Sequence, residues 1–157
     1  MYTWEYDEIP YDQKEAIKWV IKAADNGYIQ AIDSLIYSYK TDLDVEGWKV
    51  TPFQTGKDLK LHKYWAKKAA ETGLPVYQYE LAEHYENGEF EFEKNINKAL
   101  ELYKASAEQD YIEAQERMGE AYYFGDIVLK DYEEAIKWFK MIAEQPLTNY
   151  WITNVSI

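Results

Sequence analysis

One short phrase recurs along the chain, and this repetition constrains the fold more than any single residue does. The copies are KAADNG at 22–27, KAAETG at 68–73, KASAEQD at 104–110 and a fainter KMIAEQP at 140–146. Aligned on Ala24, Ala70, Ala107 and Ala143, they lie 46, 37 and 36 residues apart. Self-similarity at this period is typical of a solenoid, in which each helical pair buries its apolar face only against its neighbours.

Two helical patterns make up each unit, and the second of them contains the phrase. The segments 28–41, 75–87 and 111–124 align without gaps as first helices, with apolar positions at three- and four-residue steps. Gly27 and Gly73 end the first two copies of the phrase, at a position where a left-handed helix cap favours glycine. The pattern therefore predicts an all-α fold, a right-handed α/α superhelix of about three and a half helical-hairpin repeats.

The repeats divide the chain into predicted segments within one domain, residues 1–157. We expect a half repeat at 11–27, a repeat at 28–73 with an inserted loop at 41–57, repeats at 74–110 and 111–146, and a C-terminal cap at 147–157. The inserted loop carries Trp48 and Phe53. Large apolar side chains in a long loop indicate either a binding element or a hydrophobic plug against the helix ends, and the sequence leaves both open.

The charge balance narrows the choice of partner. Twenty-nine acidic and 17 basic side chains give a net charge of −12, which repels phosphate backbones and attracts a basic protein. The alternative is that acidity only keeps an aromatic-rich chain in solution. The first residues do not resemble a signal peptide, and no apolar run approaches the ~20 residues that span a bilayer. We therefore expect a cytoplasmic protein without a membrane or nucleic-acid partner.

The residues that usually carry enzymatic chemistry are missing from the sequence. The chain has no cysteine, and its two histidines, His62 and His84, do not occur in a metal-ligand spacing. No nucleophile motif or phosphate-binding glycine loop is present. We expect no catalytic residue, no metal and no cofactor, and we predict that the protein is not an enzyme.

The repeat consensus is similar to that of a known family. The pattern A-x-x-x-L-G-x-x-Y-x-x-G, followed by A-x-x-W-[YF]-x-K-A-A-x-x-G, resembles the Sel1-like repeat, a relative of the tetratricopeptide repeat. The copy that matches best consists of Ala114, Met118, Gly119, Tyr122, Gly125, Asp131, Ala135, Trp138, Phe139, Lys140 and Ala143. The resemblance covers residues 12–146 and implies a protein-binding adaptor or scaffold. Some bacterial members of the family look like immunity proteins that neutralise a cognate antibacterial toxin.

A stripe on the first helices is the candidate binding surface. At about 100° per residue it points away from the predicted core, and by resemblance it lines the concave groove. Six carboxylates, three tyrosines and one lysine are among its twelve positions, which are Gln30, Asp33, Tyr37, Lys40, Val76, Tyr79, Glu83, Glu86, Glu113, Glu116, Glu120 and Tyr123. Tyrosine anchors interfaces and carboxylates pair with Arg or Lys, whereas most lysines of this chain lie on the second helices.

These observations predict a protein–protein interaction module, most concretely an acidic inhibitor or immunity protein that binds a basic toxin through its groove. The alternative is a structural or regulatory adaptor that joins a larger complex or self-associates. The inhibitor is expected to be a monomer when free. The predicted contact residues are Asp33, Tyr37, Tyr79, Glu83, Glu86, Glu113, Glu116, Glu120 and Tyr123 on the helices, and Trp48 and Phe53 in the inserted loop.

Overall fold

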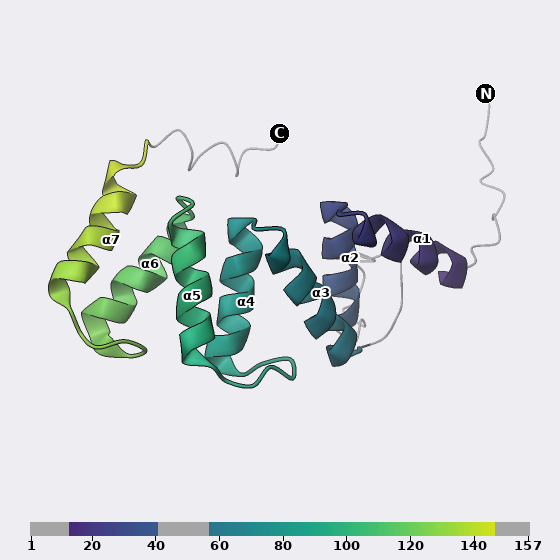
Figure 1. Ribbon diagram of the computed structural model, residues 1–157, viewed down its shortest axis with the longest axis horizontal. Helices are drawn as coiled ribbons and strands as arrows, with labels where there is room; N and C mark the ends of the chain where they lie inside the picture. The colour runs from purple at the N-terminus through teal and green to yellow at the C-terminus, as the bar shows by residue number, and fades with distance from the viewer. Residues whose placement is uncertain (1–12, 41–56, 147–157) are drawn as a thin grey trace, which may run out of the picture. The chain divides into compact units, whose positions relative to one another are not determined.

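The computed structural model describes residues 13–40 and 57–146, and in these ranges the chain forms seven α-helices, one π turn and no strand (Figure 1). The elements are α1 (Gln13–Asp25), α2 (Ile29–Lys40), α3 (Leu59–Glu71), α4 (Pro75–Asn87), α5 (Ile96–Ala107), α6 (Ile112–Glu120), the π turn η1 (Ala121–Gly125) and α7 (Tyr132–Glu144). The predicted all-α fold is confirmed. Trp48, Phe53 and the segment 147–157 lie outside the described residues.

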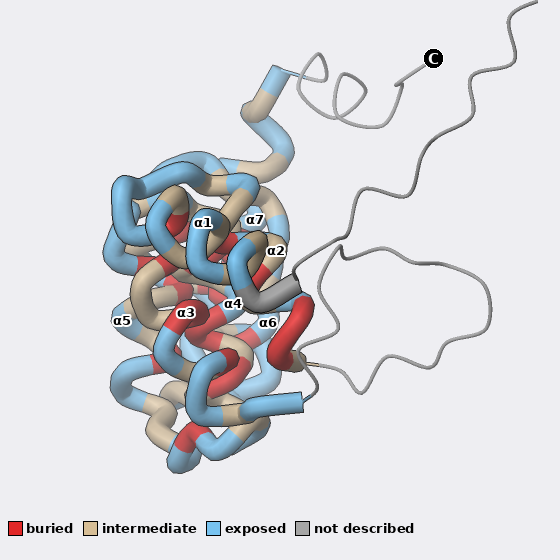
Figure 2. Tube along the Cα trace, turned by 90° about the vertical axis from the view of Figure 1, so that its right-hand side faces the viewer, coloured by how far each residue is buried: buried red, intermediate tan, exposed pale blue. Residues whose placement is uncertain are grey.

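The chain folds as two compact units, residues 1–65 and 66–157. In the first unit α1 packs against α2. In the second unit α4 packs against α5, α5 against α6 and α6 against α7, so that the contact between α5 and α6 joins the hairpins α4–α5 and α6–α7. Buried and exposed residues alternate within single helical turns along the chain (Figure 2). This is the pattern expected of amphipathic helices that bury one face. The predicted repeat borders stay a prediction.

The turns between repeats contain the left-handed residues that the phrase predicts. Gly27 has φ = 83° and Gly73 has φ = 80°. Asp110, which replaces glycine in the third copy, adopts the same conformation with φ = 62°. Asp is among the side chains that tolerate this region best, because its short polar group bonds locally. The turn is therefore kept in the third copy despite the lost glycine.

One backbone hydrogen bond closes every hairpin in the same way. It joins the carbonyl of a tyrosine near the end of the first helix to the amide of the Asp or Asn that begins the second. The three bonds run from Asp58 N to Tyr39 O (3.1 Å), from Asn95 N to Tyr85 O (2.8 Å) and from Asp131 N to Tyr122 O (2.9 Å). The same Asp and Asn side chains accept hydrogen bonds from amides of the first turn, which makes them N-caps.

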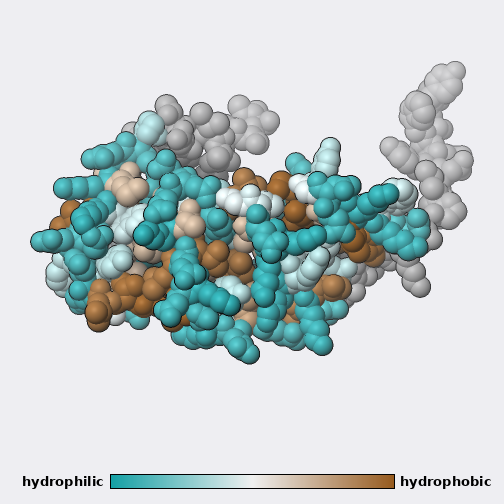
Figure 3. Space-filling view, viewed as in Figure 1, coloured by the Kyte–Doolittle hydropathy of each residue, from teal (hydrophilic) through white to brown (hydrophobic). Residues whose placement is uncertain are grey.

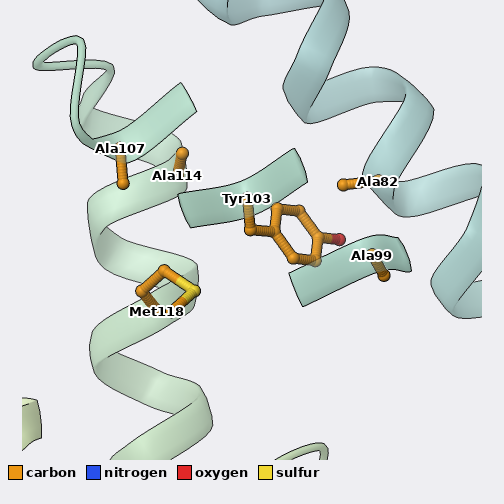
Figure 4. Packing of buried hydrophobic residues seen from close by; sticks show 6 residues of the cluster. All are labelled: Ala82, Ala99, Tyr103, Ala107, Ala114 and Met118. Carbon is orange, nitrogen blue, oxygen red and sulfur yellow. The ribbon is translucent and has the colours of Figure 1, made fainter. Parts of the chain in front are cut away.

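The core of the second unit is built from small residues around one tyrosine. Tyr103 of α5, only 1% exposed, lies between Ala82 of α4 and Met118 of α6 (Figure 4). Alanines at the facing positions let the three helices approach closely. At the next contact, a Cβ on Gly119 of α6 would lie 2.7 Å from the ring of Phe139, so this glycine makes room for α7.

Candidate functional site

Helix α6 presents a row of exposed carboxylates. Glu113, Glu116 and Glu120 are all exposed, and their spacing of three and four residues puts them on one helical face. We call these three residues the acidic row. Tyr123 follows in the π turn, also exposed, with its ring 5.0 Å from that of Phe124. Three carboxylates on a helix fixed by its neighbours form a concentrated negative surface for cationic side chains.

The predicted residues of α4 are more enclosed than those of α6. Tyr79 is half-buried, and its ring lies 5.5 Å from the ring of Tyr103 and 5.5 Å from that of Tyr111. Burial, together with the neighbouring Glu83 carboxylate, raises the pKa of Tyr79 well above its usual value, so its phenol stays neutral. Tyr79 thus supports the edge of the core and offers only part of its ring to a partner.

Carboxylates from both helices gather around these tyrosines. The pKa of Tyr111 is raised by burial first, and then by the charges of Glu113, Glu80 and Glu83. The charge of Glu113 acts on Tyr79 as well. Glu83 of α4 and Glu113 of α6 are therefore close to the same pair of rings. The structure brings these two predicted residues into one acidic, tyrosine-bearing surface.

Glu86, the second predicted carboxylate of α4, is bound within the chain. Its Oε2 accepts hydrogen bonds from the Tyr103 hydroxyl (2.7 Å) and from Arg117 Nε (3.2 Å), and Arg117 Nη2 bonds its Oε1. The Arg117 and Glu86 side chains are only 14% and 19% exposed. Burial alone raises the pKa of Glu86, but the hydrogen bonds from Arg117 and Tyr103 outweigh it and hold the pKa below its usual value. Glu86 therefore joins α4 to α6 and is already paired.

Arg117 was missed by the sequence reasoning, although a signal was present. It is the only arginine of the chain, and it lies on α6 among three glutamates. Besides Glu86 it pairs with Asp126 of the α6–α7 connection, with 2.9 Å between Nη2 and Oδ2. A planar guanidinium can bind two carboxylates at once, which a lysine ammonium does less well. A lone arginine among carboxylates indicates such an internal clamp.

The remaining predicted residues belong to the first unit or to segments that the structure does not describe. Asp33 and Tyr37 are exposed and lie four residues apart on α2, so they share one helical face. His62 is fully buried, with its Nδ1 3.0 Å from the carbonyl oxygen of Ile36, so it belongs to the packing of the first unit.

The described residues contain neither a metal-binding cluster nor a membrane-spanning helix. No three His, Asp or Glu side chains in residues 13–40 and 57–146 are placed to hold a metal ion together. Among the helices that the structure describes, none combines the length and the apolar character needed to cross a lipid bilayer. The exposed carboxylates and tyrosines are suited to contacts with a cationic protein surface.

Comparison with known proteins places the fold among repeat proteins. A family model described as the Sel1 repeat matches residues 4–28, 57–74, 75–111 and 112–147. No match was found among curated proteins.

Several solved structures are similar to the chain, and two of them are described here. One is c5321, a protective antigen of uropathogenic Escherichia coli with an SLR fold, at 32% identity and a TM-score of 0.64. The match covers 85% of this chain and only 26% of that one, so the chain spans about a quarter of that relative. The other is a Sel1 repeat protein from Oxalobacter formigenes, at 27% identity and a TM-score of 0.66, with 93% of this chain and 98% of that one covered.

Proposed function

This chain belongs to the Sel1 repeat family, whose repeats bind other proteins, and we propose that it is an acidic inhibitor of the immunity-protein kind that neutralises a basic cognate toxin. The observation that carries the proposal is the acidic row of α6, which leaves three carboxylates exposed on one face. The net charge of −12 gives the chain as a whole an excess of the same sign. The proposal assigns the chain no catalytic role and places its action in the cytoplasm.

Inhibition of this kind requires only that a surface be covered. Long-range attraction between the acidic row and a basic partner accelerates the encounter, since complementary charges act before contact is made. Tyr123, next to the row, then supplies contact area at a low cost in side-chain entropy. Glu83 and Glu113 extend the negative surface from α6 to α4. Glu86 contributes indirectly, because its pairing with Arg117 fixes the two helices against each other.

In the first step of the test, the tagged wild-type chain captures its partner from a lysate of cells that produce this chain. The captured protein is then identified by mass spectrometry. We expect a basic protein that stops growth when expressed alone and no longer does so when this chain is co-expressed. Association is then measured for the variant E113K/E116K/E120K. Its association rate should fall roughly tenfold or more at low ionic strength, because steering scales with charge complementarity.

A matched variant separates local charge from total charge. The variant E101K/E108K/E144K reverses the charge of three other exposed carboxylates: Glu101 on α5, Glu108 directly after α5 and Glu144 on α7. It changes the net charge of the chain by the same amount as the α6 variant. Its rate should stay well above that of the α6 variant at both about 0.01 M and about 0.15 M ionic strength. Equal rates for the two variants, or a captured partner that is not basic or not toxic, would contradict the proposal.

A further inference from the structure

The last helix leaves open a face that the same repeat positions bury elsewhere. In α5, Tyr103 and Ala107 lie in the core, where α6 covers them. One repeat later, 36 residues further along, the corresponding residues of α7 are Phe139 and Ala143. One side of the Phe139 ring packs on Gly119 of α6, yet the residue is still 39% exposed, and Ala143 is exposed as well. Both α7 positions are apolar, but in the described part of the chain no further helix packs over them as α6 packs over Tyr103 and Ala107.

Four residues form this open face, which we call the α7 stripe. Tyr132, Ile136, Phe139 and Ala143 follow one another at steps of four, three and four residues, so they fall within a narrow sector of the helix. Tyr132 is 55% and Ile136 is 52% exposed. The neighbouring sector carries Ala135, which is buried toward α6. The α7 stripe therefore has the spacing of a helix–helix contact, and it borders the contact with α6, to which Phe139 also belongs.

We propose that a second copy of this chain covers the α7 stripe, with the two α7 helices packed antiparallel about a two-fold axis. The argument for this occupant is charge. Glu133 and Lys140 are exposed and flank the stripe on the side away from α6. In an antiparallel pair that sets Ile136 against the second copy's Phe139, Glu133 lies opposite the second copy's Lys140, and the symmetry makes this pair twice.

The stripe also predicts how strong this contact is. Four side chains from one helix in each copy give an interface below about 1,200 Å² in total, which is in the range of weak and transient complexes. Area alone does not set the affinity, but a contact this small is expected to be weak, with a dissociation constant on the order of 1–100 µM. The three carboxylates of the acidic row are on α6 and take no part in this pairing, whereas Tyr123 lies beside Tyr132 of the stripe, with 5.4 Å between the ring centroids. The inference replaces the expectation that the free protein is a monomer.

The first test is the mass of the full chain measured by sedimentation equilibrium from about 1 µM to 1 mM. We expect a reversible monomer–dimer equilibrium. Ile136→Glu should raise the dissociation constant about tenfold or more, because it places a charge at the centre of the contact. Leu129→Glu is the matched control. Leu129 is almost fully exposed in the α6–α7 connection, where Figure 3 shows hydrophobic surface at the lower left, but it lies outside the stripe. Leu129→Glu should leave the monomer–dimer equilibrium unchanged.

Charge exchange tests the orientation of the two helices. Glu133→Lys alone and Lys140→Glu alone should each raise the dissociation constant roughly threefold to tenfold, because like charges then face each other. The double variant E133K/K140E should restore the wild-type value. A wild-type chain that stays a monomer at 1 mM overturns the proposal. If removal of residues 147–157 then produces a dimer, that segment of the same chain is the occupant of the stripe. Failure of the double variant to recover overturns the antiparallel pairing.

Discussion

The acidic positions of α4 and of α6 occupy the same stripe of the repeat, yet they are available to a partner to very different extents. Glu116 and Glu120 of α6 are exposed, whereas Glu86 of α4 is held by Arg117 and Tyr103. The difference lies in the neighbours, because Arg117 reaches back from α6 to α4. A helical stripe thus selects the positions that face away from the core, but adjacent long side chains decide which of them are free to bind.

The loss of Arg117 should have the largest effect on the stability of the chain, because Arg117 makes the difference between α4 and α6. Arg117→Ala leaves Glu86 partly buried without its cation, and we expect a loss of about 2–3 kcal/mol in the free energy of unfolding, since removing one partner of a buried pair strands the other charge. The residual exposure of both side chains keeps this below the value for a fully buried pair. Urea denaturation measures it.

The control for this prediction is a carboxylate of the acidic row. Glu120→Ala should change the unfolding free energy by less than about 0.5 kcal/mol, as is usual for exposed surface positions. The double variant R117A/E86A should be less destabilised than the sum of its single variants, because the two side chains interact. Strict additivity would show that the pair does not couple α4 to α6.

A smaller effect is expected from the tyrosines of the two helices. Tyr79→Ala removes a half-buried ring packed against Tyr103 and Tyr111, and should cost about 2 kcal/mol of unfolding free energy. Tyr123→Ala removes an exposed ring and should cost less than about 1 kcal/mol. Thermal unfolding followed by circular dichroism compares the two. Equal losses would mean that the α4 and α6 tyrosines are equivalent, against the structure.

The smallest expected effect concerns pH. The pKa of Glu86 is lower in the folded chain than its ordinary value of 4.5, so between the two values the unfolded chain binds more protons. Stability from this carboxylate is therefore fully present at neutral pH and is lost as the pH falls below about 4.5. Glu86→Gln should flatten this part of the stability–pH curve, whereas Glu120→Gln should leave its slope unchanged. Urea midpoints across that range measure both slopes.

The helices and their ends were predictable because they depend on local pattern. Apolar periodicity gave the helix positions, and Gly27 and Gly73 gave the turns with positive φ. The N-caps at Asp58, Asn95 and Asp131 were missed, although Asp and Asn directly before a helical pattern are a signal for them.

The composition of the surface was less predictable, since it depends on contacts between repeats. Angular position alone does not distinguish Glu86 from Glu120, because only a neighbouring helix shows that one of them is paired. Gln115 is a similar case. Its side chain is fully buried on α6, where it donates to the carbonyl of Ala107 (3.0 Å) and accepts from Gln145 (2.8 Å). No sequence rule for exposed polar residues anticipates a buried glutamine that joins three elements.

The shared hydrogen bond between a tyrosine carbonyl and an Asp or Asn cap also has an evolutionary consequence. The chain distance that it spans is 19 residues from Tyr39 to Asp58, 10 from Tyr85 to Asn95 and 9 from Tyr122 to Asp131. Because the entropic cost of closing a loop grows only slowly with the length of the loop, the same hydrogen bond can close connections of very different lengths. The segments that connect the two helices of a hairpin can therefore change in sequence or in length during evolution, while the helices that they connect are inherited unchanged.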